Sequence, residues 1–590
     1  MTSRAMGVAW MLGAAVWLGS ASVGVRADAL AGTLRVGLPL MPDTLDPARS
    51  DNMVTGNVMA GIYDTLYTLD PLARPPVVVP LAAASLPEVS ADYRTYTIRV
   101  RSGIFFTPHP AFGGKPRELT AADFAYAIRR ILDPKLRSPA LFLLENKIEG
   151  LDALAARARS ENRAIDYAAP VAGLVLVDRQ TLRIRLNAPD PIFAFLLASP
   201  NLGAIAHEVV EAEGNAYGQR PIGSGAYLVA EFTPGQRLVL RRNPDYRTRH
   251  WEDLLAPASR AAHASHPMRG RKLPGFERVE FSYTPEASPE LLALERGELD
   301  LIMVFERELV INGGKLKPEL AARGLQLVRD PSPTVLLSFF SMKDPTLGGN
   351  GNDRIALRRA IQMAIDDTEY IRVLEAGNAT VREQVVPPGI EGHIDAYRNP
   401  NTFNPAAANA LLDRFGYQRG ADGYRRMPDG SALVATSLIG TSTTARKGAE
   451  FTKRMLDRIG VRTAFDTVPG AERVKRMSNC RFGMATMDWG LDIPDGTNPM
   501  SMFYSKAIGA ANMSCYVDPE FDVAYEKALV TPPGPARLEL FRTMQARLDA
   551  YAPMRPRPVG DTLLLKRGQL LGPFGTVSDW LQLVTLAPGP

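Results

Sequence analysis

The chain has 590 residues, of which 46% are hydrophobic and 22% are charged, and its formal net charge is +5. These fractions are typical of globular proteins and exclude a largely disordered chain. The length exceeds what one hydrophobic core usually supports, so about two to four domains are expected. Acidic and basic residues are mixed along the chain without a long Lys/Arg run, which argues against a nucleic-acid-binding tract.

The first predicted element is a secretory signal peptide at residues 1–27. Arg4 precedes an apolar stretch that ends in Val25-Arg26-Ala27, which has the small-x-small pattern of a cleavage site. We expect cleavage there and a periplasmic mature protein. The alternative is a retained membrane anchor, because about 20 apolar residues can just span a bilayer. Neither of the two cysteines lies near this segment, so the sequence does not predict a lipoprotein.

Strands and helices alternate irregularly along the rest of the chain. Residues 33–38 and 95–101 have the patterns of strands, and Thr120 precedes a predicted helix with Asp123 placed as in a capping box. Such alternation predicts an α/β protein with mixed sheets. The other predicted elements are the strands 182–187, 221–229, 237–242 and 480–489, and the helices 352–376, 404–416 and 536–553.

Three short motifs resemble parts of enzyme sites, and none is complete. HEVVE (207–211) has Glu211 where a zinc-protease helix needs its second histidine. Ser224 lies in GSG, but Ile222 stands where a nucleophile elbow needs glycine. His263 and His266 have no acid or cysteine close in sequence, so we expect a solvated surface there. The sequence therefore predicts no enzyme, no cofactor and no metal site.

The order of several segments resembles the bacterial extracellular solute-binding proteins of family 5, the dipeptide/oligopeptide-binding type. Each segment is short, and the resemblance rests on their order over almost the whole mature chain. The segments are LDPARS (45–50), the predicted helix and turn YDTLYTLD (63–70), the strand, glycine turn and helix within 96–134, PIGSGAYLV (221–229), RRNPDYR (241–247), GELDL (297–301) and the predicted helix DRIALRRAIQMAIDD (353–367).

The resemblance implies a two-lobed periplasmic binding protein fold of type II, with an extra domain inserted in the first lobe and a hinge between the lobes. A ligand would be enclosed when the lobes close, and an inner-membrane ABC permease would receive it. The protein is expected to be a monomer that binds no nucleic acid. The predicted division is signal peptide 1–27, first lobe 28–72, inserted domain 73–197, first lobe 198–330, second lobe 331–557 and first lobe again 558–590.

The resemblance also assigns candidate ligand-binding residues. In the family's peptide binders a Trp-x-x-Asp at a strand end meets the ligand, and Trp489 and Asp492 match it. A buried carboxylate is costly unless it is paired, and the α-ammonium of a peptide would supply a charge-assisted partner. The alternative is that Asp492 caps a helix or pairs with an arginine. The rest of the predicted set is Met487, Gly490 and Asp495, together with Arg49, Ser50, Asp51, Asn52 and Met53, which match the family's first-lobe loop only by position.

The expected function is the periplasmic substrate-binding component of an ABC importer for a peptide or a similar amine-bearing solute. The segment after Asp492 departs from the family pattern, so a non-peptide solute such as an opine, a nickel complex, haem or a glycan is one alternative. A secreted peptide hydrolase and an envelope chaperone are alternatives of other classes. The sequence leaves open whether Cys480 and Cys515 form a disulfide, which an oxidising compartment would permit.

Overall fold

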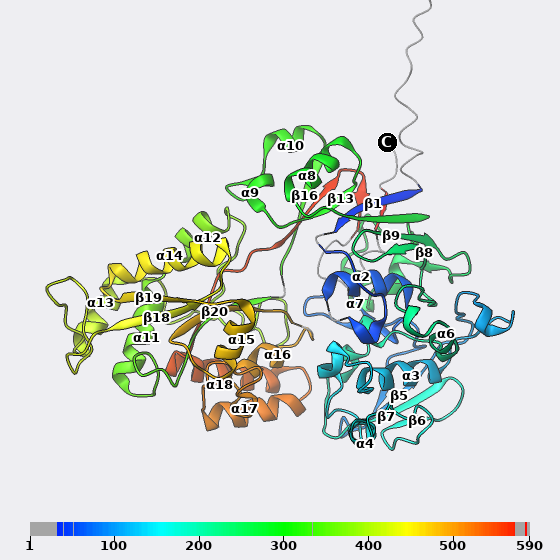
Figure 1. Ribbon diagram of the computed structural model, residues 1–590, viewed down its shortest axis with the longest axis horizontal. Coiled ribbons are helices and arrows are strands. Elements are labelled where there is room, and N and C mark those ends of the chain that lie inside the picture. Colours follow the sequence, from blue (N-terminus) through cyan, green and yellow to red (C-terminus); the bar gives the residue numbers. More distant parts are fainter. Residues whose placement is uncertain are drawn as a thin grey trace, which may run out of the picture.

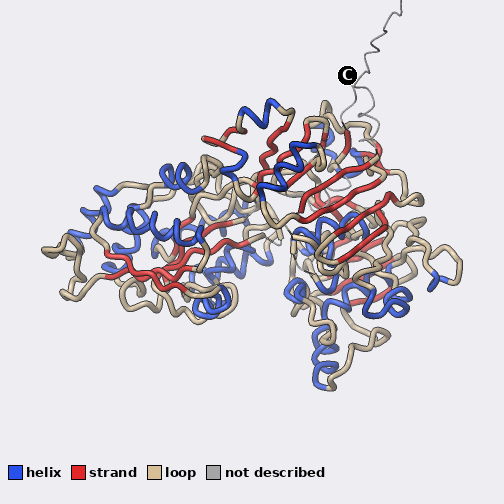
Figure 2. The backbone as a smooth tube through the Cα atoms, turned by 45° about the horizontal axis from the view of Figure 1, so that its top comes forward, coloured by secondary structure: helices blue, strands red, loops and turns tan. Residues whose placement is uncertain are grey.

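The computed structural model describes residues 32–38, 40–50, 52–332, 334–491, 493–572 and 584–586. The predicted signal peptide, Asp51 and Asp492 lie outside these ranges. The described chain forms two lobes that stand side by side and are joined by extended crossings (Figure 1). A view turned by 45° shows the same two bodies (Figure 2). The predicted α/β class with mixed sheets and two lobes is confirmed.

The first lobe is built on a seven-stranded sheet in the order β16-β22-β13-β1-β12-β9-β8. Strand β1 pairs in parallel with both β12 and β13, so these three strands end at the same edge of the sheet. That edge is directed toward the second lobe (Figure 1). The strands are β1 (Thr33–Leu38), β8 (Tyr227–Thr233), β9 (Arg237–Arg242), β12 (Arg278–Tyr283), β13 (Leu301–Val304), β16 (Leu325–Asp330) and β22 (Thr562–Arg567), and helices α2 (Met53–Ile62), α8 (Ala287–Arg296), α9 (Arg307–Val310) and α10 (Pro318–Ala322) accompany them.

The second lobe contains a five-stranded sheet in the order β19-β18-β20-β17-β21. Its two faces bury different cores: Leu337 and Phe339 pack on the side of α16, α17 and α18, whereas Phe340 and Met484 pack on the side of α11, α13 and α14. Burial on both faces explains why β17 reads as a nearly continuous apolar run, VLLSFF. The strands are β17 (Val335–Phe340), β18 (Val434–Ile439), β19 (Arg462–Thr467), β20 (Met484–Trp489) and β21 (Met554–Pro556), and the helices are α11 (Asn352–Ala364), α12 (Asp367–Leu374), α13 (Pro405–Arg414), α14 (Thr443–Arg458), α15 (Gly470–Ser478), α16 (Thr497–Met500), α17 (Pro519–Val530) and α18 (Pro535–Tyr551).

Two short segments carry the chain between the sheets. Strand β16 of the first sheet ends at Asp330, and β17 of the second begins at Val335. On the return, β21 ends at Pro556 and β22 begins at Thr562. Hinges between lobes are a few residues at the ends of elements or in loops, and these two connections are short enough to act as one. The exact domain boundaries given above remain predictions.

A third, four-stranded sheet with the order β4-β5-β7-β6 packs beside the first lobe. Its strands are β4 (Glu88–Val89), β5 (Thr95–Arg99), β6 (Leu174–Leu176) and β7 (Thr181–Arg185), and helices α3 (Ala121–Leu132) and α4 (Leu151–Ser160) accompany it. Buried ion pairs fasten this part of the chain to the first lobe. Arg130 of α3 forms a bidentate pair with Asp46, at 2.7 and 2.9 Å.

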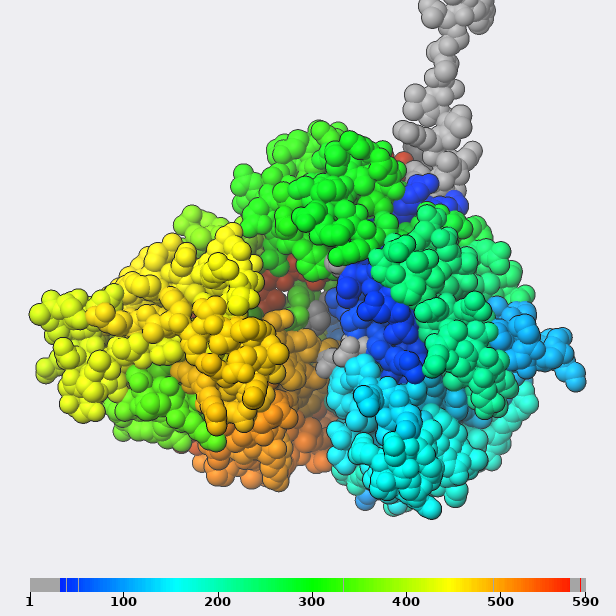
Figure 3. Space-filling view, in the orientation of Figure 1, coloured from blue at the N-terminus to red at the C-terminus, as the bar shows by residue number. Residues whose placement is uncertain are grey.

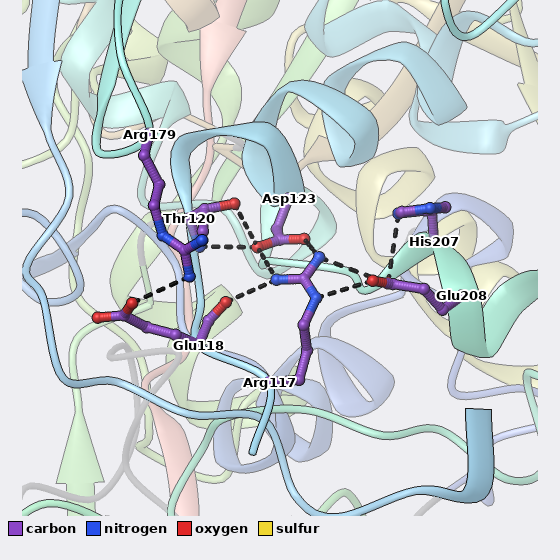
Figure 4. A network of polar contacts seen from close by, with 7 residues as sticks. All are labelled: Arg117, Glu118, Thr120, Asp123, Arg179, His207 and Glu208. Atoms are coloured by element: carbon purple, nitrogen blue, oxygen red, sulfur yellow. Dashed lines mark hydrogen bonds and ion pairs between the residues drawn. The ribbon is translucent and has the colours of Figure 1, made fainter. Parts of the chain in front are cut away.

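A second anchor is the polar network around Arg117 (Figure 4). The Arg117 guanidinium lies 2.7 Å from an oxygen of Asp123 and 2.8 Å from an oxygen of Glu208, the second residue of α6 (His207–Glu213). The predicted capping role of Asp123 is confirmed, because its carboxylate accepts a hydrogen bond from the Thr120 backbone N–H at 2.7 Å. One arginine thus links the start of α3 to α6.

Two predicted elements differ from the structure. The helix expected over 352–376 is two helices, α11 and α12, because the Asp366 side chain accepts from the backbone N–H of Glu369 and starts a new helix. Aspartate is a strong helix-capping residue, so the apolar periodicity on both sides of this break concealed it. In the segment 63–70, which was expected to be a helix and turn, residues 67–69 form strand β2 (Tyr67–Leu69).

The incomplete enzyme motifs have ordinary structural surroundings. HEVVE lies in α6, and Ser224 is a buried turn residue whose hydroxyl donates to Asp64 at 2.8 Å. His266 stacks on Trp251 with their ring centroids 5.1 Å apart. Within the described ranges, no three His, Cys, Asp or Glu side chains converge as a metal site would need. No helix in the same ranges has the length and apolarity needed to cross a bilayer.

Candidate functional site

The space-filling view shows a hollow between the two lobes, bordered by the blue and green first lobe and the yellow and orange second lobe (Figure 3). On the first-lobe side, the carboxyl ends of β1, β12 and β13 meet. Crevices outside the carboxyl ends of parallel strands are the usual ligand sites of open α/β sheets. The candidate site is this interlobe cleft.

Large apolar side chains are exposed at the first-lobe edge of the cleft. Tyr283 is the last residue of β12, and Leu40 and Phe305 follow the ends of β1 and β13. Met53 is the first residue of α2, after the loop that follows β1. These four side chains are between 39% and 64% exposed. Burying such side chains is ordinarily favourable by about 1.5–3 kcal/mol each. A group of them left open beside a hollow marks a surface that binds something.

The second-lobe side of the cleft is formed by the end of β20. Trp489, its last residue, pairs with Val335, which lies five positions after the final residue of β16, so Trp489 stands next to the crossing between the lobes. Its indole N–H donates to Asn498 Oδ1 at 3.0 Å. This hydrogen bond fixes the orientation of the ring, which is half-buried against the second-lobe core.

The neighbours of Trp489 differ in their exposure. Met487, on the same side of β20, is half-buried against the second-lobe core, whereas Gly490 is exposed and a Cβ added there would meet no atom within 4 Å. Asp488, on the opposite side of the strand, is exposed. Asp492, the predicted ammonium anchor, lies outside the described residues, so its role stays a prediction.

Asp495, one of the predicted ligand-binding residues, is buried in the second lobe. The sequence placed it with the ligand-binding residues, but its side chain is 1% exposed and pairs with Arg537 through contacts of 2.5 and 2.9 Å. Its Oδ1 also accepts from the hydroxyl of Thr497 at 2.6 Å. These partners use the carboxylate inside the second lobe, so we do not include Asp495 among the proposed ligand contacts.

The first-lobe loop contributes exposed and structural residues. Arg49 has a half-exposed side chain 3.7 Å from Asp46, and Met53 is exposed. Ser50 is buried, and the Asn52 side chain caps α2 by accepting from the Thr55 N–H at 2.8 Å. Asp51 lies outside the described residues. Of this predicted group, Arg49, Asn52 and Met53 are exposed in the structure, although the amide oxygen of Asn52 is used by the helix cap.

Polar contacts beside the crossings were not found from the sequence. Arg307 of α9 in the first lobe forms an ion pair of 2.9 Å with Glu375 of the second, and burial is the main cause that raises the pKa of Glu375. The guanidinium of Arg557, on the return crossing, lies over the Tyr370 ring at 4.5 Å, and burial lowers the pKa of Arg557. The run RPRP at 555–558 could have drawn attention to Arg557, because it coincides with the predicted crossing.

Comparison with known proteins gives the same architecture. The model of the family described as "Bacterial extracellular solute-binding proteins, family 5 Middle" matches residues 77–511. Di/tripeptide-binding protein 2 of Pseudomonas aeruginosa (strain UCBPP-PA14) is 24% identical over 541 residues, which are 89% of this chain and 89% of that protein.

Two solved structures share the fold over most of both chains. HbpA2 from Haemophilus parasuis has a TM-score of 0.74 at 20% identity and covers 94% of this chain and 100% of its own. The periplasmic murein tripeptide-binding protein MppA in its unliganded open form has a TM-score of 0.72 at 21% identity, covering 94% and 97%. With the family match over most of its length, the two lobes and the double crossing, the chain belongs to the bacterial extracellular solute-binding proteins of family 5.

Proposed function

We propose that this protein captures a small amine-bearing solute, most directly a short peptide, between its lobes in the periplasm and delivers it to an inner-membrane ABC permease. The observation that carries the proposal is the cleft itself, with exposed apolar side chains on the first lobe and Trp489 beside the crossing on the second. The relatives named for di/tripeptide and murein tripeptide binding support a peptide as the ligand. We further propose that the chain has no enzymatic activity of its own.

In the proposed cycle, the ligand closes the hinge by contacting both lobes at once, since only contacts absent from the open form favour the closed form. The apolar first-lobe edge would cover side chains or aliphatic parts of the solute. Trp489 would form a wall of the pocket, and Asp492 would accept the ammonium. A charged hydrogen bond in a closed, dry cleft is strong, and it selects for ligands with a free amine.

The test compares Asp492→Asn with wild type by isothermal calorimetry, using the tripeptide Ala-Ala-Ala and its N-acetylated form. We expect N-acetylation and the substitution each to weaken binding by about 30-fold or more, because each removes one partner of the same buried charge pair. N-acetylation of the peptide should then weaken its binding to the Asp492→Asn variant only slightly further. Asp488→Asn is the matched control, since Asp488 lies on the opposite side of the strand from Trp489 and should bind like wild type.

Equal affinity of wild type and Asp492→Asn for Ala-Ala-Ala would remove the anchor role. Strong binding of the acetylated peptide by wild type would also contradict the anchor role of Asp492. If wild type bound neither peptide, and instead held a solute without an amine, the peptide proposal would be wrong while the capture role would stand.

A further inference from the structure

A cavity of about 290 Å³ lies at the carboxyl end of β13, between the first turn of α8 and α9. Its lining includes Thr284 and Pro285, which follow β12, and Phe305, which follows β13, so it lies at the edge of the sheet that faces the second lobe. Pockets for entire small ligands usually begin at about 300 Å³. This cavity therefore suits one chemical group of a ligand. Its walls are mostly aliphatic: Leu291, Ile302, Met303, Val304, Leu309 and Val310.

One acidic residue lies in this mostly apolar lining. Glu290 of α8 lines the cavity and is 8% exposed. Its Oε1 lies so close over Gly37 of β1 that a Cβ at that position would overlap it. None of the described residues forms an ion pair or a hydrogen bond with the Glu290 carboxylate, and burial alone raises the pKa of Glu290 to about 7.

A lone carboxyl in an apolar cavity costs free energy that a leucine would not cost. The ion pairs elsewhere in the first lobe show the contrast, since buried Asp46 and Asp64 are both held by arginines. Among the described residues Glu290 has no such partner, and it lines a cavity with room for one. A cation that enters supplies the missing partner, and the aliphatic walls cover the stem that carries it.

We propose that this cavity binds a single ammonium or guanidinium group on an aliphatic stem, with Glu290 as its counter-ion. The other ionisable residue of the lining, Glu306, adds negative charge and no competing cation. Because the cavity lies at the sheet edge that faces the second lobe, it would serve as a subsite for a lysine-like or arginine-like side chain of the captured solute. That last assignment rests on the proposed function, whereas the cation site itself does not.

The direct test uses n-butylammonium chloride as the probe and the methyl signal of Met303 as the reporter. Protein labelled with ¹³C-methyl methionine is titrated at pH 8, where Glu290 is ionised, and the signal is assigned with Met303→Leu. We expect a saturable shift of the Met303 signal in wild type, and a dissociation constant about tenfold or more weaker in Glu290→Gln. Glu286→Gln, an exposed position one turn earlier, is the control and should behave like wild type.

No saturable shift at Met303 in wild type would overturn the proposal, and so would an equal dissociation constant in Glu290→Gln. Folding of the variants is checked by comparing the rest of the methionine spectrum.

A second measurement separates the subsite from the proposed function. Calorimetry compares Ala-Lys-Ala with Ala-norleucine-Ala, which has nearly the same shape without the charge. We expect wild type to prefer the lysine peptide by about tenfold or more, and Glu290→Gln to lose that preference while it still binds the norleucine peptide. Equal binding of the two peptides by wild type would overturn the subsite. A butylammonium site in a protein that binds neither peptide would uphold the cation site and contradict the proposal that the captured solute is a peptide.

Discussion

Replacing Arg537 by methionine is expected to lower the free energy of unfolding by about 3–5 kcal/mol. The Asp495–Arg537 pair is buried, with side-chain exposures of 1% and 0%. Arg537 also donates from Nε to the Ala528 carbonyl at 2.9 Å, and its guanidinium lies 5.4 Å from the centre of the Phe541 ring. Loss of the guanidinium leaves the Asp495 carboxylate buried without its cation, and this unpaired charge is the source of the large cost.

Urea denaturation followed by circular dichroism measures the effect. The double variant Asp495→Leu/Arg537→Met should regain most of the loss, because it removes both charges and fills the space with apolar atoms. Arg542→Met is the matched control on the same helix: Arg542 pairs with Glu539 at a surface where the side chains are 46% and 71% exposed, so a change within about 0.5 kcal/mol is expected. If Arg537→Met were as mild as Arg542→Met, the structural role given to this pair would be wrong.

Opening the disulfide is the second large change. The structure joins Cys480 to Cys515 across 35 positions, and the closed loop contains the end of β20 with Trp489. In the chain-entropy model, a loop of this length stabilises the folded state by about 3–4 kcal/mol. We therefore expect Cys480→Ser/Cys515→Ser to unfold at clearly lower urea concentration than wild type.

Dithiothreitol provides the control for the disulfide. It should lower the unfolding midpoint of wild type toward that of the double serine variant and leave the variant itself unchanged. Identical unfolding of wild type with and without the reductant, once loss of the disulfide has been verified by mass spectrometry, would contradict the stabilising role.

Much of the fold could be predicted because local patterns and global fold agree. Thr120 and Asp123 indicate the start of α3, because a capping box depends on residues only three positions apart. The alternation of residues 95–101 is typical of a strand with one buried face, and β5 is such a strand. The break between α11 and α12 was missed because one capping aspartate, Asp366, outweighs a periodicity that continues on both sides.

The candidate site was less predictable because it depends on contacts between distant segments. Asp495 lies close to Trp489 in sequence, yet its side chain is buried because it pairs with Arg537, which is 42 positions away. The buried position of Glu290 could not be predicted, because its surroundings come from β1, β13 and α9, which meet only in the folded protein. The pairing of the two cysteines was open for the same reason.

Native mass spectrometry of the protein purified from the periplasm without refolding shows whether the closed lobes hold an amine-bearing solute. We expect additional masses that match short peptides, released on denaturation and depleted in Asp492→Asn. A stoichiometric ligand without any amine, found equally in wild type and Asp492→Asn, would contradict it.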